Sequence, residues 1–251
     1  MTPDEQLLRG QLAIFCILIV PAQYVFFKHG LGGFMGWLFV LSFCAIRIVG
    51  CAMEIHEENQ PTLSTAALIV SSLGLSPILL ALMGVLEEAR NARSGRRGGW
   101  LQLIIVTQYH ALVIVAIVLI LIHASSLLSA HRTSTAKTFI DAGFALLCAS
   151  WLFICVFTLV SVAFVREKSM NIELYRGGTR LLYAVMICLP FVGMRMVYAT
   201  IVYAADNTTA ESSFGLRVAF GVVTEFVVAI VLLVAGVMTR NLQRERKRTE
   251  C

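Results

Sequence analysis

Three ionisable side chains, Arg47, Arg195 and Glu225, lie deep inside apolar stretches of the sequence. An ionisable group near the centre of a membrane costs at least ~2.5–3.5 kcal/mol on insertion scales, so each of these residues is a candidate for function. Counted along helices that rise about 1.5 Å per residue, all three fall at a similar depth in the outer half of a bilayer. We therefore expect one polar pocket, buried among helices and opening toward the lumenal or extracellular side.

Two acidic residues, Glu225 and Glu54, are the candidate general acids, with Arg47 and Arg195 as their catalytic partners. Glu54 follows Arg47 by two helical turns on nearly the same face, closer to the mouth of the expected pocket. A carboxyl group kept protonated by apolar surroundings can start acid chemistry without a metal ion. If an arginine contacts Glu225 directly, its carboxylate is a poor acid and Glu54 becomes the better candidate. The alternative is that Arg195 and Glu225 form only an interhelical ion pair that fixes the bundle.

Aromatic and acidic side chains near the same level are candidates to line the pocket. Phe43, Tyr198 and Phe226 could hold a substrate and present ring faces to a cation, and packing within the bundle is the alternative for each of them. Asp141 enters its apolar run near the outer surface, where it is a candidate for substrate binding or else a cap or interface residue. His110 lies in mid-membrane, where a hydrogen-bonded packing role is expected.

The elements that must position these residues are transmembrane helices. The chain has 251 residues, of which 58% are hydrophobic and 14% are charged, and its mean hydropathy is +0.82. Soluble domains carry about 25% charged residues, so this composition excludes a water-soluble globule. Seven apolar runs are long enough to cross about 30 Å of hydrocarbon; they are 10–28, 33–54, 62–86, 100–124, 138–164, 181–204 and 216–238. The expected fold is an all-α bundle of seven transmembrane helices over 1–239, followed by a basic cytosolic tail, 240–251.

The distribution of lysine and arginine predicts the orientation of this bundle. Alternate connecting segments hold fourteen of these residues on one side and four on the other. Because short cytoplasmic loops carry the excess, the N-terminus is predicted to be lumenal or extracellular and the C-terminus cytosolic. Glu87 and Glu88, next to four arginines, are then expected to form a solvated cytosolic rim. Asn207 begins a glycosylation sequon in a predicted outer loop.

Several chemistries lack the residues they require. The run 216–238 contains no lysine for an opsin-type Schiff base, and no aspartate-rich pair is present to hold a magnesium diphosphate. The seven cysteines show neither metal-ligand nor disulfide spacing, and no nucleotide-binding loop is present. The basic residues occupy connecting segments rather than one continuous face, which gives no support for nucleic-acid binding. We expect no metal and no cofactor.

Three segments and one residue carry a resemblance over the whole chain: 43–50 (FCAIRIVG), 73–80 (LGLSPILL), 189–195 (LPFVGMR) and Glu225. Through them the chain resembles a fungal family of small seven-helix membrane proteins. Similarly sized membrane proteins of fungal meroterpenoid pathways are terpene cyclases of the ascofuranone and macrophorin type, which protonate an epoxide or terminal alkene on a prenylated aromatic. The resemblance implies a lipophilic prenylated substrate, acid-initiated cyclisation without a cofactor, other pathway enzymes as partners and an endoplasmic reticulum membrane.

Two other functions remain open. Seven helices with an external N-terminus match the topology of a receptor-like or transport protein without enzymatic activity, although the cytosolic loops are short and the usual receptor motifs are missing. A scaffold for pathway enzymes is the third possibility, with the basic tail held at the anionic lipids of the bilayer.

Overall fold

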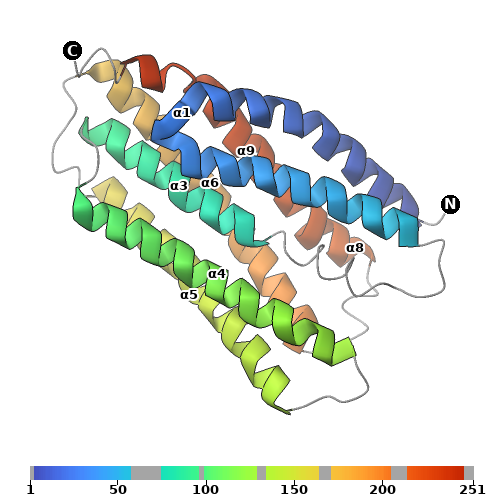
Figure 1. Cartoon of the computed structure of the whole chain (residues 1–251). Helices are drawn as coiled ribbons and strands as arrows, with labels where there is room; N and C mark the ends of the chain where they lie inside the picture. Colours follow the sequence, from blue (N-terminus) through green and yellow to red (C-terminus); the bar gives the residue numbers. More distant parts are fainter. Residues whose placement is uncertain are drawn as a thin grey trace.

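The chain folds into a bundle of long helices. A computed structural model describes residues 3–57, 75–95, 99–128, 134–163, 171–204 and 214–245. The helices in these ranges are α1 (Pro3–Glu57), α3 (Leu75–Ser94), α4 (Trp100–Leu128), α5 (Ser134–Ala163), α6 (Ile172–Ala204), α8 (Phe214–Leu216) and α9 (Thr224–Met238), with the π-helix η1 (Arg217–Val223) joining the last two. Figure 1 shows the helices running up and down the bundle, with the start of α1 and the end of α9 at opposite ends.

Helix α1 consists of two antiparallel legs. The chain turns between them at Gly30, whose φ of 50° and ψ of −151° are not helical. A positive φ of this kind is accessible to glycine at little cost because it has no Cβ atom. The legs correspond to the apolar segments Glu5–Gly30 and Gly32–His56, so the first two predicted spans are separate membrane-length helices.

Six helical segments of the described chain are long and apolar enough to cross a membrane. The chain is therefore a multi-pass membrane protein. Helix α3 is not one of these six segments. It corresponds to the second half of the predicted span 62–86, because residues 58–74 lie outside the described part. Helix α3 continues to Ser94, well beyond the predicted end at 86. The seven-helix topology and its orientation stay predictions.

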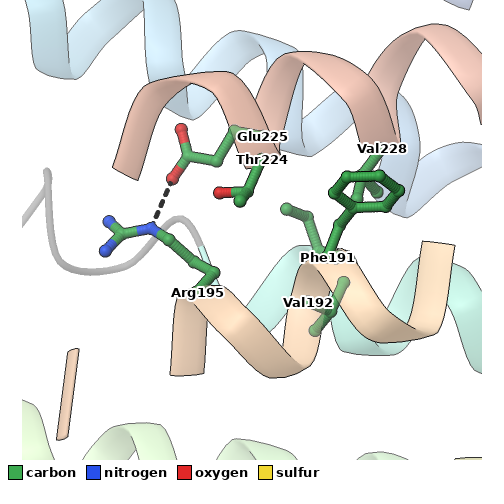
Figure 2. A pocket seen from close by; sticks show the side chains of 7 residues that line it. Phe191, Val192, Arg195, Thr224, Glu225 and Val228 are labelled. Carbon is green, nitrogen blue, oxygen red and sulfur yellow. Dashed lines mark hydrogen bonds and ion pairs between the residues drawn. The ribbon is translucent and has the colours of Figure 1, made fainter. Parts of the chain in front are cut away.

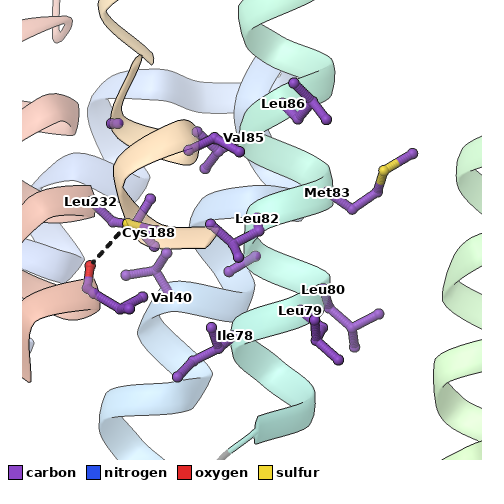
Figure 3. Packing of buried hydrophobic residues seen from close by; sticks show 14 of the residues in the cluster. Val40, Ile78, Leu79, Leu80, Leu82, Met83, Val85, Leu86, Cys188 and Leu232 are labelled. Atoms are coloured by element: carbon purple, nitrogen blue, oxygen red, sulfur yellow. Dashed lines mark hydrogen bonds between the residues drawn. The ribbon is translucent and has the colours of Figure 1, made fainter. Parts of the chain in front are cut away.

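Helix α3 occupies the centre of the bundle and contacts α1, α4, α5 and α6. Leu82 and Val85 point toward Val40 of α1 and Cys188 of α6, whereas Met83 points to the opposite side of α3 (Figure 3). All of these side chains are at most 2% exposed. The first half of α3, residues 76–86, is buried on every side, and an apolar segment of this kind is stable only when other helices surround it, which explains why α3 is central.

Glycines bring α3 into backbone contact with its neighbours. A Cβ atom added to Gly84 would lie 2.4 Å from the Cα of Gly36, and one added to Gly178 would lie 2.7 Å from the carbonyl oxygen of Ala89. Small residues of this kind allow close helix crossings in membranes, where apolar side chains alone give no preference for protein over lipid.

Candidate functional site

Glu225 of α9 binds two arginines from other helices. Its Oε1 accepts a hydrogen bond from Nε of Arg195 on α6 at 3.2 Å (Figure 2), and its Oε2 accepts one from Arg47 on the second leg of α1. The side chains of Glu225, Arg47 and Arg195 are 1%, 9% and 15% exposed. The prediction that these three residues meet is confirmed, and we call them the three-charge cluster.

The backbone around the three-charge cluster is irregular. The π-helix η1 ends one residue before Thr224, whose hydroxyl donates to the carbonyl oxygens of Phe220 at 2.7 Å and Gly221 at 3.1 Å. On α6, Pro190 lies five residues before Arg195 and cannot donate a backbone hydrogen bond. π-Helical turns are rare and occur often at functional sites, because they widen the helix and redirect the side chains that follow.

A small pocket adjoins the cluster, and its side chains stand too close together to leave room for a water molecule. Arg195, Thr224 and Glu225 supply its polar side, and the rest of its lining is apolar: Ile78, Phe191, Val192 and Val228 (Figure 2). Binding sites for drug-sized ligands usually measure about 300–1,000 Å³. The expected chamber is thus present only as a small pocket, because α3, α6 and α9 pack closely beneath the charges.

The predicted aromatic residues divide into two groups. Phe43, only 2% exposed, packs edge-on against Phe15 with ring centroids 5.5 Å apart, and Phe226 packs against the same ring at 5.1 Å. Tyr198 instead stacks on Phe220, and the guanidinium of Arg195 lies 5.8 Å from the centre of its ring. Packing is therefore the role that the structure gives Phe43 and Phe226, and Tyr198 alone of the three contacts a charge of the cluster.

A second buried charged cluster lies near the corner of α1, and we call it the His29–Glu88 cluster. Nδ1 of His29 lies 2.8 Å from Oε1 of Glu88, and its Nε2 lies 3.0 Å from the carbonyl oxygen of Gly236. Nε1 of Trp37 donates to Oε2 of Glu88 at 2.7 Å. The side chains of His29 and Glu88 are 0% and 2% exposed. The cluster therefore joins both legs of α1 to α3 and α9.

The expectation that Glu88 belongs to a solvated rim is wrong. The helix continues past the predicted end of the span, so that Glu88 turns toward α1 instead of toward water. Two glycines make the space: a Cβ atom on Gly33 would lie 2.4 Å from the carboxylate of Glu88, and one on Gly236 would lie 2.6 Å from the ring of Trp37. Glu87, one residue earlier, is half-buried.

Comparison with known proteins places the chain in a family without assigning an activity. A family model described as a domain of unknown function, DUF7702, matches residues 2–242. The chain belongs to the DUF7702 family. No curated protein matches it. A solved structure, the rhodopsin of Exiguobacterium sibiricum, is 11% identical over 96% of this chain and 98% of that one, with a TM-score of 0.46. This likeness is too weak to transfer any property.

The remaining predicted site residues do not line the pocket. Asp141 is exposed on α5 and does not line the pocket, which argues against its predicted contact with a substrate. Glu54 is half-buried two turns beyond Arg47. Asn207 lies outside the described residues, so its predicted glycosylation stays a prediction.

His29 and Trp37 are the residues that sequence reasoning missed. The periodicity of the apolar runs gave no signal for either, since His29 lies at a predicted loop and Trp37 lies within the apolar run 33–54. The signal that was present is the combination of a histidine, two nearby glycines and a glutamate at the same end of neighbouring helices. Within the described ranges, no group of three or more histidine, cysteine, aspartate or glutamate side chains could hold a metal ion.

Proposed function

We propose that the protein is a ligand-binding membrane protein of the receptor-like or transport type, and that the three-charge cluster binds a small organic anion. The observation that supports this most directly is the sharing of one carboxylate, Glu225, by the two guanidinium groups of Arg47 and Arg195. Within this cluster, two cations share one anion. Guanidinium groups are suited to carboxylate and phosphate ligands because their planar donors match two oxygens at once.

The pocket beside the cluster favours an amphiphilic ligand. The side chains fill the pocket as they stand, so an entering headgroup would have to displace Arg195, and the apolar lining, for example Val192 and Val228, would then contact the chain of the ligand. Arg195 is the most exposed member of the cluster at 15%, so it is the group that an entering anion would meet first. The ligand class that fits is an anionic headgroup on an apolar tail.

Thermal unfolding of the full chain in phosphatidylcholine nanodiscs tests this proposal. Decanoate and decyl phosphate should raise the unfolding midpoint, while decanol and decyltrimethylammonium, with tails of the same length, should not. A ligand at about 100 times its Kd contributes roughly 2.7 kcal/mol of stability. The response should be lost in Arg195→Gln, recovered in part in Arg195→Lys, and retained in Arg180→Gln, a matched change of an exposed arginine on the same helix.

Two results would contradict the proposal. One is an equal response to decanol and decanoate, which would mean that the tail alone is recognised. The other is a response to anions that Arg195→Gln leaves unchanged, which would place the binding elsewhere on the protein.

The terpene cyclase implied by the sequence resemblance has less support. Both oxygens of Glu225 already accept hydrogen bonds from arginine, and the pocket is small for a prenylated aromatic. Glu54 is then the acid that this function would require. Turnover of a prenyl-epoxide phenol to a cyclic isomer by membranes that contain the protein, abolished by Glu54→Gln, would support the cyclase and overturn our proposal.

A further inference from the structure

The hydrogen bonds of the His29–Glu88 cluster determine how many protons it holds. The carbonyl oxygen of Gly236 can only accept, so Nε2 of His29 must carry a hydrogen. Trp37 can only donate, so Oε2 of Glu88 must be an acceptor. One further proton is then required between Nδ1 of His29 and Oε1 of Glu88, which are 2.8 Å apart. Whether that proton resides on the imidazole or on the carboxyl group, the pair as a whole is neutral.

We propose that His29 and Glu88 form a proton-binding site, and that their single shared proton holds α1, α3 and α9 together at this end of the bundle. The site shares no residue with the three-charge cluster, so it does not depend on the anion-binding proposal. Its ligand is the proton itself. Release of the proton loosens the contact between the corner of α1, the second half of α3 and the end of α9.

Any change in the proton count creates an unpaired charge. Loss of the proton leaves a carboxylate on Glu88 facing the lone pair of Nδ1, and gain of a second proton leaves a buried imidazolium without a counter-ion. Side chains that are 0% and 2% exposed cannot be hydrated in place, so either change favours opening of the cluster to water. The closed arrangement therefore belongs to one protonation state, and stability falls as the pH rises through the step at which the proton leaves.

Other charged groups near this end of the bundle are engaged elsewhere or lie toward solvent. The ammonium of Lys28 lies 5.6 Å from the centre of the Tyr24 ring, and Arg90 of α3 lies 4.0 Å from the centre of the Phe157 ring. Arg93 donates to the carbonyl oxygen of Ser161. The remaining charged groups at this end of the surrounding helices are half-buried or exposed: Glu87 on α3, Glu173, Arg176 and Arg180 on α6, and Arg240, Arg244 and Glu245 after α9. Among the described residues, no other charged side chain forms an ion pair with His29 or Glu88.

The geometry also shows where opening would act. Thr239, which follows α9, donates to the carbonyl oxygen of Ala235 at 2.7 Å and lies 3.5 Å from Nε2 of His29. Leu242, in the next helical turn, is buried against Gly177 of α6. Opening of the cluster at His29 would therefore displace the segment after α9, including Thr239 and Leu242, and a binding partner could detect that displacement.

The test uses the full chain in neutral phosphatidylcholine nanodiscs. The ¹⁵N resonances of His29 are followed from about pH 5 to about pH 10, a range that covers histidine titration, and are assigned with His29→Gln. Emission of Trp37 is recorded over the same range in a Trp100→Phe, Trp151→Phe background. We expect one step in the His29 resonances, accompanied at the same pH by a red shift of Trp37 emission and a lower unfolding midpoint.

Variants decide whether the step belongs to the pair. In Glu88→Gln the amide can donate to Nδ1 and its oxygen can accept from Trp37, so the cluster stays closed and the step should vanish. Glu87→Gln, the adjacent matched change, should retain it. The proposal is overturned by His29 resonances that do not change over the whole range, by a step that persists in Glu88→Gln, or by a step that leaves Trp37 emission unaltered. If Glu88→Gln does not fold, the titration of the unmodified pair still decides.

Discussion

The three-charge cluster and the His29–Glu88 cluster both bury charged side chains among the helices, but they differ in how these side chains are paired and how exposed they are. In the first, two arginines bind one carboxylate, Arg195 keeps some exposure, and a pocket lies alongside. In the second, a neutral pair is enclosed completely, and both nitrogens of His29 and both oxygens of Glu88 have partners. On our proposal, the first arrangement binds a ligand through Arg195, its most exposed member. The His29–Glu88 cluster is closed to solutes, so the only ligand that we propose for it is a proton.

If each cluster has the role that we propose, accessibility, and not burial alone, distinguishes the ligand site from the proton site. The π-helix η1 and Pro190 disturb the helices around the first cluster, whereas two glycines, Gly33 and Gly236, fit the second into regular helices. The predictions below set the two clusters against each other in order of expected effect.

The largest effect is expected from Glu88→Ala. The substitution leaves the imidazole of His29 and the indole nitrogen of Trp37 without their acceptor, and opens a void in the core. Loss of one partner of a buried pair costs about 3–5 kcal/mol, so the free energy of unfolding should fall by that amount. Glu87→Ala, measured by the same unfolding assay, should change it by less than about 0.5 kcal/mol, as substitutions outside the core usually do. If both variants lost the same free energy of unfolding, Glu88 would not contribute more to the core than Glu87 does.

Glu225→Gln should cost less, about 2–3 kcal/mol, because Arg195 is partly hydrated even though two cations lose their carboxylate. The two clusters should then differ in chemical rescue. Glu225→Ala, unlike the glutamine variant, leaves room for a small carboxylate, so added formate should restore much of its unfolding midpoint by binding between Arg47 and Arg195. Formate should not restore Glu88→Ala, whose site is closed to solutes. Rescue of both variants, or of neither, would show that the clusters do not differ in access.

Gly33→Ala probes the space that holds Glu88. The added methyl group would lie 2.4 Å from a carboxylate oxygen that His29 and Trp37 keep in place, so the second leg of α1 or α3 must shift. Such overpacking costs about 1–2 kcal/mol. Gly10→Ala is the control, since nothing lies within 4 Å of its added Cβ atom, and it should be neutral or slightly stabilising by thermal unfolding. An unchanged midpoint in Gly33→Ala would mean that Glu88 is not held rigidly.

The smallest effect is expected from Asp141→Asn. The residue is exposed on α5 and belongs to neither cluster, so the free energy of unfolding should change by less than about 0.5 kcal/mol. Binding of decanoate, followed by the shift of the unfolding midpoint, should also be unchanged. A loss of binding would return Asp141 to the site and would show that the pocket extends to α5.

Much of the helical architecture and half of the charged chemistry could be predicted from the sequence. The apolar runs and the depths of Arg47, Arg195 and Glu225 were sufficient to predict that these residues meet. The reason is that a helix has a fixed rise per residue, so that the position of a residue in its run gives its depth in the bilayer. The position of Glu88 was not predictable in this way. It lies beyond the apolar part of α3, where hydropathy indicates a boundary although the helix continues.

The sequence by itself determined that the chain is a bundle of membrane-crossing helices with three charges at one level, since the cost of polar groups in hydrocarbon restricts every long apolar run to a helix. Only the tertiary structure decided that α3 is the central helix, that the pocket beside Glu225 is small, and that His29 and Glu88 form a closed pair. These features depend on which helix faces are in contact and how closely glycines let them approach, and neither quantity is contained in the periodicity of one helix.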